Sequence, residues 1–383
     1  MSDPFFDGTL LIRQRSLPSY RVPLFERIGK MCRRLVVVTS KLPTEDSMIE
    51  TDQLVNGDWI RLQGRSLGKG VTLVYWQSGL KKTLKSVSAD AIITEANPRF
   101  VDTGLLKRWS RDNECPILGW GLGTTNFFGH GYANLRNWRR ARTLRQFDAL
   151  IAYGSVAKQQ YCDGFGISPD CVFVAHNATS DTPSLGADAL RERCESMAAT
   201  PFTVLTIGRL IANKNLELLI DAAHQLKERG LLIQVVMVGD GSHREALQAH
   251  AKRLDVAAFF PGHLEGSQLE TVARQAHLFV LPGLGGLAIQ QAMAFGLPVI
   301  VSQADGTETD LVRPTNGWQV PPNDASMIAN AIESAAADRP GTTQKAVESL
   351  RIASEEINLS TMATKMIEAV NQTSRIKLTR VNR

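Results

Sequence analysis

Two cations stand close together in one loop near the middle of the 383-residue chain. Arg209 follows Gly208, and Lys214 comes five residues after Arg209 in the loop 207–215. An arginine presents a planar fork of donors to phosphate oxygens, and a lysine presents a mobile point charge. The pair therefore suits a diphosphate group, although two solvated loop residues would produce the same pattern.

A second stretch, Leu278–Val301, is uncharged and is interrupted by glycine and proline. Its length and low charge are compatible with a transmembrane helix, but the glycines and prolines divide it into shorter pieces. The pieces predict a strand over 278–281, a glycine turn, a helix over 287–295 and a strand over 298–302. Free N–H groups at the start of such a helix form an anion site.

The glycine turn also permits a different interpretation. The run 283–288 matches the dinucleotide fingerprint G-x-G-x-x-A, and Asp305 follows the next strand, where a ribose-binding acid is expected. A nicotinamide- or flavin-dependent oxidoreductase is therefore an alternative. The fingerprint, however, follows the fourth strand of its domain rather than the first, and it gives Arg209 and Lys214 no role.

The elements that must position these loops alternate between strands and helices, which predicts doubly wound parallel sheets in an α/β fold. The predicted strands of the first half are Thr9–Arg13, Arg34–Thr39, Ala91–Thr94, Pro116–Trp120, Ala149–Tyr153 and Val172–Ala175. Those of the second half are Phe202–Ile207, Ile233–Val238, Ala258–Phe260, Leu278–Leu281, Val299–Val301 and Gly317–Val320. We therefore expect two Rossmann-like domains, residues 1–178 and 200–356, facing each other across a cleft, and a final helix over 357–374. Ligands of such sheets bind beyond the carboxyl ends of the strands.

Composition and charge narrow the function classes. The chain is 43% hydrophobic and 21% charged, with five scattered cysteines and no CxxC pair, so neither a disulfide framework nor a zinc site is predicted. The N-terminus lacks the pattern of a secretory signal, and we expect a cytoplasmic protein. Residues 1–180 hold 24 Lys and Arg against 16 Asp and Glu (+8), and the remainder holds 19 against 22 (−3). A basic first half suits an acidic substrate or an anionic membrane; no nucleic-acid module accompanies it.

Five short stretches together carry a family resemblance. They are Gly208-Arg-Leu with Lys214-Asn215, Val238-Gly-Asp-Gly241, Phe260-Pro-Gly262, Gly286–Ile300 and Gly306-Thr-Glu-Thr-Asp310. This series resembles the retaining glycosyltransferases of family 4, which have the two-domain GT-B fold and use nucleoside-diphosphate sugars. The resemblance covers about residues 200–340. In the first half it is thinner and includes Tyr20-Arg-Val-Pro-Leu-Phe25.

The resemblance implies roles for individual residues. Arg209 and Lys214 would neutralise the diphosphate of a UDP- or GDP-sugar, which is a co-substrate; no cofactor or metal is implied. The N–H groups of Gly286, Leu287 and Ala288 would hold the same phosphates. The remaining donor-binding residues would be Gly208, Gly239, Asp240, Gly262, His263, Leu264, Gly285 and Gln291, with 262–264 against the nucleobase. Residues at strand ends of the first domain would face the acceptor, namely Arg15, Glu95, Asn97 and Asn177. Taken alone, a carboxylate at the position of Asp240 is more often a cap for a helix beginning at Arg244 than a ligand.

The sequence also departs from the family. Two glutamates usually lie eight positions apart in the glycine-rich stretch, where this chain has Gly283 and Gln291. A histidine is usual at the fifth strand end of the first domain, where this chain has Leu122; His130 is the candidate catalytic substitute. A non-catalytic nucleotide-sugar-binding homologue is therefore a further alternative.

A basic segment, 134–147, alternates arginines with Leu, Trp and Phe, and a basic tail occupies 375–383. Both suit either a solvated surface or contact with an anionic bilayer or a lipid-diphosphate acceptor. We expect an enzyme of cell-surface polysaccharide or glycolipid assembly, peripheral at the inner face of a membrane, with a glycan or lipid-linked acceptor.

Overall fold

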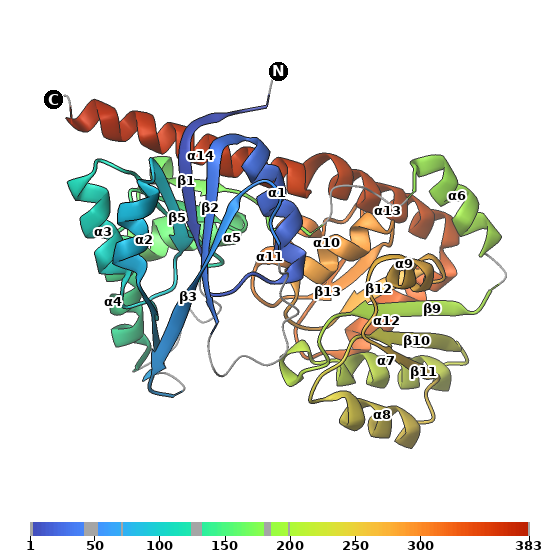
Figure 1. Cartoon of the computed structure of the whole chain (residues 1–383). Helices are drawn as coiled ribbons and strands as arrows, with labels where there is room; N and C mark the ends of the chain where they lie inside the picture. Colours follow the sequence, from blue (N-terminus) through green and yellow to red (C-terminus); the bar gives the residue numbers. More distant parts are fainter. Residues whose placement is uncertain are drawn as a thin grey trace. The chain divides into compact units, whose positions relative to one another are not determined.

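The computed structural model describes residues 3–41, 53–69, 72–123, 132–179, 185–197 and 200–381. The chain divides into two compact units (Figure 1). Unit 1 comprises Met1–Thr179 and Leu359–Arg383, and unit 2 comprises Ser180–Asn358. Each unit is built on its own sheet.

Unit 1 has an eight-stranded sheet in the order β4-β3-β2-β1-β5-β6-β7-β8. Its strands are β1 (Phe6–Arg13), β2 (Cys32–Lys41), β3 (Asp58–Leu67), β4 (Val74–Ser78), β5 (Ala91–Glu95), β6 (Ile117–Gly121), β7 (Ala149–Ala152) and β8 (Val172–Val174). Neighbouring strands are parallel except β3 and β4, which are antiparallel. The carboxyl ends of the parallel strands therefore meet along one edge, which we call the carboxyl edge of unit 1.

Alternation along the strands of unit 1 sends successive side chains to opposite faces, so that each face has its own core. Leu10 and Ile12 belong to one core cluster, whereas Leu11 belongs to the other. The helices of this unit are α1 (Val22–Lys30), α2 (Leu80–Val87), α3 (Thr103–Asp112), α4 (Tyr132–Leu144), α5 (Ser155–Gln159) and α14 (Leu359–Val381).

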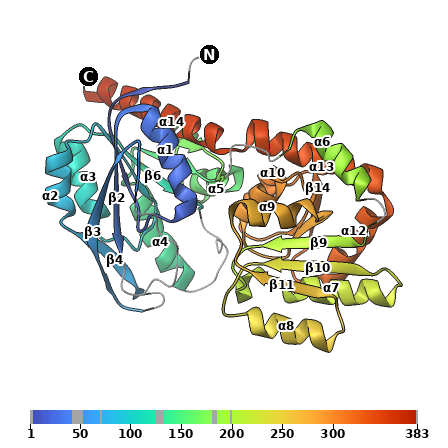
Figure 2. The same ribbon diagram turned by 45° about the vertical axis from the view of Figure 1, so that its right-hand side comes forward.

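The closing helix, α14, lies beside α1 although the two are more than 300 residues apart in sequence (Figures 1 and 2). Its buried face, which includes Met362, Met366 and Val370, joins the core cluster of α1 and β1. The helix continues to Val381, so that residues 375–381 of the basic tail are helical.

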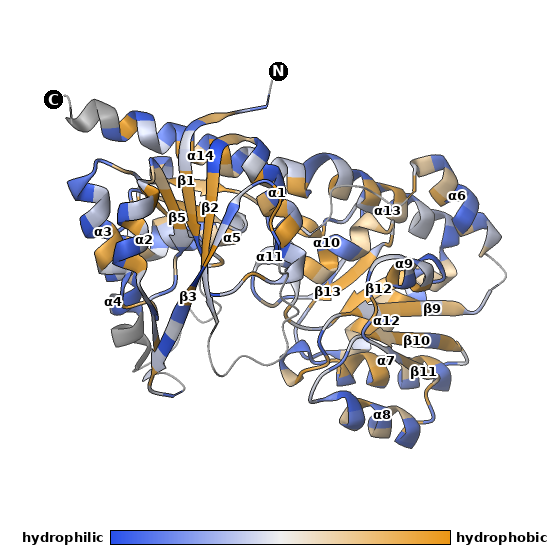
Figure 3. Ribbon diagram, viewed as in Figure 1, coloured by the Kyte–Doolittle hydropathy of each residue, from blue (hydrophilic) through white to orange (hydrophobic). Residues whose placement is uncertain are grey.

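Unit 2 has a six-stranded, entirely parallel sheet in the order β11-β10-β9-β12-β13-β14. Its strands are β9 (Phe202–Ile207), β10 (Ile233–Val238), β11 (Ala258–Gly262), β12 (Leu278–Leu281), β13 (Val299–Ser302) and β14 (Gly317–Val320). Its helices are α6 (Ala187–Ser196), α7 (Glu217–Glu228), α8 (Arg244–Arg253), α9 (Gly266–Arg274), α10 (Gly286–Ala294), α11 (Thr307–Leu311), α12 (Ala325–Ala337) and α13 (Arg339–Arg351). The central strands β12 and β13 are fully buried. Figure 3 shows them as hydrophobic, which is expected of parallel strands covered on both faces.

Every strand predicted from the sequence is present within a few residues of its predicted ends, and the doubly wound α/β prediction is confirmed. The structure adds β3 and β4, which extend one side of the unit 1 sheet. Strand β3 mixes hydrophilic and hydrophobic residues (Figure 3), with Asp58, Arg61 and Gln63 among the hydrophilic ones, and all but one of its residues are exposed or partly exposed. It therefore lacks the continuous apolar run that revealed the buried strands.

Candidate functional site

Five loops of unit 2 converge at the carboxyl edge of its sheet because all of its strands are parallel. They follow β9 at Gly208, β10 at Gly239, β11 at Gly262, β12 at Pro282 and β13 at Gln303. The loops that the sequence analysis singled out are thus brought together at one edge.

Lys214 lies at the centre of this edge and is only 9% exposed. A methyl group added to either Gly208 or Gly285 would lie 2.9 Å from its Nζ atom, so the ammonium sits between these two glycines. It has no hydrogen-bond or ion-pair partner among the residues that the structure describes. Burial, reinforced by the charge of Arg209, lowers the pKa of Lys214 to about 8, against an opposing effect of Asp305. A buried cation that is not paired with an anion is unfavourable, and an anionic ligand would relieve this cost.

Arg209 supplies a second cation to the same edge. Its side chain is exposed, and within the described ranges it forms no hydrogen bond or ion pair. Its effect on the pKa of Lys214 shows that the two positive charges are close enough to repel each other. Both therefore favour binding of a group with more than one negative charge.

The start of α10 faces the site with unpaired donors. Gly285 caps the helix with a φ of +157°, and the N–H of Ala288 donates to its carbonyl oxygen at 2.9 Å. The N–H groups of Gly286 and Leu287 donate to no residue in the described part of the chain. These two groups, rather than all three that the resemblance implied, are available to an anion.

Steric contacts explain why position 283 is a glycine. A methyl group there would lie 2.6 Å from the carbonyl oxygen of Asn213 and 2.7 Å from Cα of Lys214. The N–H of Leu284 also donates to the Asn213 oxygen at 3.3 Å. The backbone of residues 213–214 thus fills the space that a side chain at position 283 would need, and this contact holds the Lys214 loop against the start of α10.

The loops after β9 and β10 are also in backbone contact. A methyl group on Gly239 would overlap the carbonyl oxygen of Gly208, and one on Gly241 would overlap that of Leu210. The N–H of Leu210 donates to the Asp240 carbonyl oxygen at 2.9 Å. Gly239 therefore positions the loop that carries Arg209.

The remaining predicted donor residues line the same edge in different ways. Asp240 accepts the N–H of Gly241 at 2.7 Å and lies 3.8 Å from Arg244; α8 has no side-chain cap, so the capping interpretation is wrong. His263 is exposed and hydrogen-bonds Glu265 at 3.0 Å. Leu264 packs on the core, and Gln291 is half-buried.

Glu308, which has no predicted role, is 4% exposed. Its carboxylate accepts the N–H groups of Ala304 and Gly306, each at 2.9 Å, and so shapes the loop after β13. Asp305, the acid of the dinucleotide interpretation, accepts the N–H and the hydroxyl of Thr307. Glu308 lies within the quoted run 306–310, but nothing in that run distinguishes a loop-shaping carboxylate from a ligand.

Predicted acceptor-side residues lie at the carboxyl edge of unit 1. The N–H of Arg15 donates to Glu95 at 2.7 Å. Asn97 accepts the N–H of Arg99 at 3.1 Å and so closes a turn. Asn177 accepts from Arg21 at 2.6 Å, a contact that the sequence analysis missed.

Two residues of unit 1 remain: His130, the predicted catalytic histidine, and Arg13, to which no role was assigned. His130 lies outside the described residues, and its catalytic role stays a prediction. Arg13, at the end of β1, is buried in a structural network: it donates to Gln77 at 2.7 Å and to Asp102, and lies 4.0 Å from the centre of the Phe100 ring.

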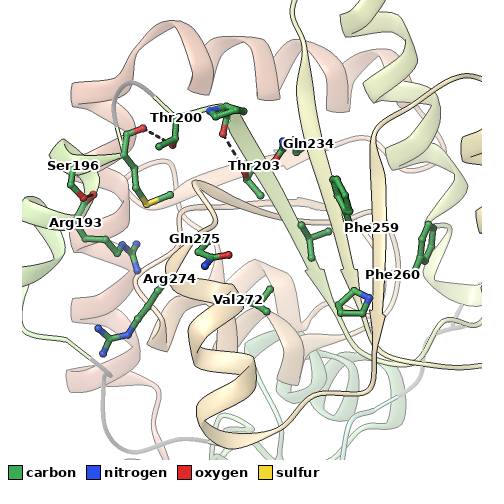
Figure 4. Close-up of a pocket in the computed structure, with 14 residues that line it drawn as sticks. Arg193, Ser196, Thr200, Thr203, Gln234, Phe259, Phe260, Val272, Arg274 and Gln275 are labelled. Carbon is green, nitrogen blue, oxygen red and sulfur yellow. Dashed lines mark hydrogen bonds between the residues drawn. The ribbon is translucent and has the colours of Figure 1, made fainter.

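A hollow of about 750 Å³ lies elsewhere on unit 2 (Figure 4). Its walls include Phe259, Val236 and Val272, with Arg193 and Arg274 at one end. None of the predicted donor residues lines it. Among the described residues, no group of three or more His, Cys, Asp or Glu is placed to hold a metal ion. The same part of the chain contains no helix with the length and apolarity needed to cross a bilayer.

The family model described as Glycosyl transferases group 1 matches residues 193–352. WcaL of Escherichia coli (strain K12), named for colanic acid biosynthesis, is 28% identical over 161 residues, 39% of this chain and 40% of WcaL. AmsK of Erwinia amylovora, an amylovoran biosynthesis glycosyltransferase, is 26% identical over 34% of each chain. This chain thus spans two fifths or less of the length of these curated relatives.

Solved structures match much more of the chain. HepE of Anabaena in complex with UDP superposes with a TM-score of 0.74 at 18% identity, over 95% of this chain and 99% of HepE. Sucrose-phosphate synthase of Thermosynechococcus elongatus gives a TM-score of 0.72 at 18% identity, over 95% and 98%. At this identity the likeness concerns the fold. Residues 193–352 are therefore a domain of the glycosyl transferases group 1 family, in a chain with the GT-B fold.

Proposed function

We propose that the protein is a retaining glycosyltransferase of the family 4 type, which moves a sugar from a UDP- or GDP-sugar onto an acceptor hydroxyl. The observation that carries the proposal is the buried ammonium of Lys214, which has no ion-pair or hydrogen-bond partner among the described residues. Arg209 and the unpaired N–H groups of Gly286 and Leu287 lie at the same edge. A donor diphosphate would supply the negative charge that all of these groups lack.

In the proposed reaction the bond between the anomeric carbon and the diphosphate oxygen breaks, and the acceptor oxygen bonds that carbon on the same face. The diphosphate leaves with the bonding electron pair and takes the proton of the acceptor hydroxyl. Arg209 and Lys214 stabilise the charge that develops on it. Fixed charged groups that face a developing charge supply a large share of catalysis. In the proposed reaction the two side-chain cations would stabilise the leaving diphosphate, as a metal ion does in other enzymes.

The proposed donor site extends from the phosphates to the nucleoside. The nucleobase would lie against Gly262, His263 and Leu264, and the amide of Gln291 would reach the ribose hydroxyls. HepE has been solved with UDP and with UDP-glucose, which makes UDP the first nucleotide to test. Because Gly283 leaves no side chain for the donor sugar, recognition of the sugar would rest on other groups.

The proposed setting is the assembly of a cell-surface polysaccharide or glycolipid. The names of WcaL and AmsK refer to colanic acid and amylovoran biosynthesis. A glycan or lipid-linked acceptor would approach unit 1, where Arg15, Glu95 and Asn177 lie.

A thermal-shift panel of UDP, GDP, NAD⁺ and NADP⁺ separates the candidate functions. We expect UDP or GDP to raise Tm by several degrees, because a ligand that binds only the folded state stabilises it. A shift with NAD⁺ or NADP⁺ alone would replace the proposal with an oxidoreductase. Nucleotide binding without any turnover of UDP- or GDP-sugars would leave a non-catalytic binding protein.

The pH profile of transfer should report Lys214. Its pKa of about 8 in the free enzyme means that the ammonium loses its proton as pH rises through 8. We expect kcat/KM for the donor to fall about tenfold per pH unit above that point, while kcat persists to higher pH because the bound diphosphate favours the protonated lysine. The Lys214→Arg variant stays charged, so its kcat/KM should not fall above pH 8. A wild-type kcat/KM that stays constant up to pH 9.5 would contradict the role of Lys214.

Contact with an anionic membrane is a further proposal, for the end of α4. Trp138 is 59% exposed, and Arg139, Arg142 and Arg145 are exposed beside it. An aromatic side chain among cations suits the interface of an anionic bilayer, where each cation adds roughly 1 kcal/mol.

Sedimentation with phosphatidylserine vesicles tests this surface. Changing Arg139, Arg142 and Arg145 to glutamine should weaken vesicle binding about a hundredfold, since three such cations contribute about 3 kcal/mol. The matched control changes three exposed arginines of unit 1 that are paired with carboxylates, Arg33, Arg34 and Arg111. Equal losses in both triple variants would mean that binding follows net charge rather than this surface.

A further inference from the structure

Arg21 is a buried cation at the carboxyl edge of unit 1, and the proposed function gives it no role. It is 5% exposed and stands directly before α1. Its guanidinium lies 4.8 Å from the ring centre of Trp120 and 5.9 Å from that of Tyr153, and it donates to Asn177 at 2.6 Å. Trp120 is the last residue but one of β6, Tyr153 follows β7 directly, and Asn177 comes three residues after β8, so the guanidinium lies near the carboxyl ends of three parallel strands.

Among the described residues, no carboxylate forms an ion pair with the Arg21 guanidinium. In the same part of the chain, the guanidinium has one hydrogen-bond acceptor, the neutral amide of Asn177. A guanidinium has five N–H donors, so most of its donor capacity is unused. Aromatic faces attract a cation but do not replace an anionic partner.

The surroundings make the imbalance larger. The first turn of α1 contains no acidic residue, and the positive end of its dipole lies beside Arg21. Glu95, a carboxylate of this edge, accepts the N–H of Arg15 at 2.7 Å, and its charge acts on Arg13 and on Tyr153. The indole N–H of buried Trp120 also has no acceptor among the described residues. Donors thus outnumber acceptors around Arg21.

Arg13 provides an internal comparison. It is equally buried, but Asp102 pairs with its guanidinium and Gln77 accepts its Nε–H. Among the described residues, a carboxylate therefore lies against one buried arginine of this edge, Arg13, and none pairs with the other, Arg21. The partners of Arg13 account for its burial as part of the structure, whereas those of Arg21 leave its charge unpaired.

We infer that Arg21 binds an oxyanion of the acceptor, a carboxylate or a phosphate, with Asn177 holding the guanidinium in place. This inference rests on the proposed function, because it names the class of acceptor: an acidic glycan unit or a phosphorylated one rather than a neutral sugar. The oxyanion would accept from the unused N–H groups of Arg21 and supply the missing counter-charge.

Calorimetric titration of the full chain tests the inference with three probes: glucuronate, glucose 1-phosphate and glucose. UDP or GDP, whichever the thermal-shift panel selects, is added first to saturation, so that the donor site is occupied. We expect at least one acidic probe to bind about tenfold or more tightly than glucose, with an affinity that falls as salt increases. Preference for glucuronate identifies a carboxylate, and preference for glucose 1-phosphate identifies a phosphate.

Variants assign the effect to Arg21. Arg21→Gln should bind the acidic probe about tenfold more weakly, Arg21→Lys should retain part of the affinity, and both should bind UDP as the wild type does. The control is Arg34→Gln, which removes an exposed arginine of the same unit that is paired with Asp58. A merely structural Arg21 would lower Tm without changing the preference for acidic over neutral probes.

Two results would overturn the inference: glucose binding as tightly as both acidic probes, or an acidic preference that survives in Arg21→Gln. If Arg21→Gln does not fold, the affinities of the wild type and of Arg21→Lys for the acidic and neutral probes still test the inference. Failure of the proposed function is distinguishable, because it would appear in the first step as absence of UDP or GDP binding.

Discussion

Lys214→Met is expected to reduce sugar transfer by about 10²–10³-fold while making the protein more stable. The loss of rate follows from removing a positive group that faces the leaving diphosphate, an effect of the size seen when one preorganised donor is deleted. Methionine fills the space of the lysine stem without its charge. Initial rates with a nucleotide sugar and urea unfolding of the same sample measure both quantities.

The gain in stability follows from the pKa of Lys214. Burial lowers it from 10.5 to about 8, so at neutral pH the folded state holds a charge that the environment disfavours by about 3 kcal/mol. Between pH 8 and 10.5 the unfolded chain binds more protons than the folded one, and the stability of the wild type therefore rises with pH. The difference between wild type and Lys214→Met should be about 1–3 kcal/mol at pH 7 and should vanish near pH 10.5.

Lys214→Arg is the matched control, because it keeps the charge at the same place. It should retain much of the rate and none of the stability gain. Lys214→Met with near-normal turnover would refute the proposed role, and a large loss of stability in this variant would mean that Lys214 has a structural partner.

Gly283→Glu, which introduces the residue usual in the family, is expected to abolish activity rather than improve it. A methyl group at this position already comes within 2.7 Å of the Lys214 backbone, so any larger side chain must displace the 213–214 loop. Overpacking of this kind costs about 1–3 kcal/mol, and a shift of about 1 Å in a catalytic group lowers rates about a hundredfold.

Gly283→Ala separates sterics from charge, since it should produce most of the same loss. The control is Gly186→Ala in the same unit, where an added methyl group meets nothing within 4 Å and should change neither rate nor Tm. Activity above a tenth of wild type in Gly283→Glu would show that the loop contact does not position Lys214.

The strands were predictable because they are buried. Runs such as Leu278–Leu281 and Val299–Val301 are continuous and apolar, which is the signature of a parallel sheet covered on both faces. Strand β3 was not predictable from that signature, because one side of it is exposed and its polar residues interrupt the pattern. Its place in the sheet depends on pairing with β2, which is a long-range contact.

The cations of the site were predictable from residue type and position after a strand, whereas their surroundings were not. Nothing in the loop 207–215 indicates that Lys214 is buried and Arg209 exposed, since that depends on residues 283–285 packing over Lys214. Gly283 was recognisable as a departure from the family, but its cause lies in a contact with residues about 70 positions earlier. Arg21 was part of a quoted motif, yet only the tertiary structure reveals that its charge is unbalanced.

The central claim is that the carboxyl edge of unit 2 binds the diphosphate of a nucleotide sugar. Calorimetric titration of the full chain with UDP, GDP and the corresponding nucleosides measures this most directly. We expect one diphosphate to bind at least about a hundredfold more tightly than its nucleoside, and Lys214→Met to lose most of that difference, because charged hydrogen bonds to phosphate contribute most of it. Equal binding of nucleoside and diphosphate, or a difference unchanged in Lys214→Met, would contradict the claim.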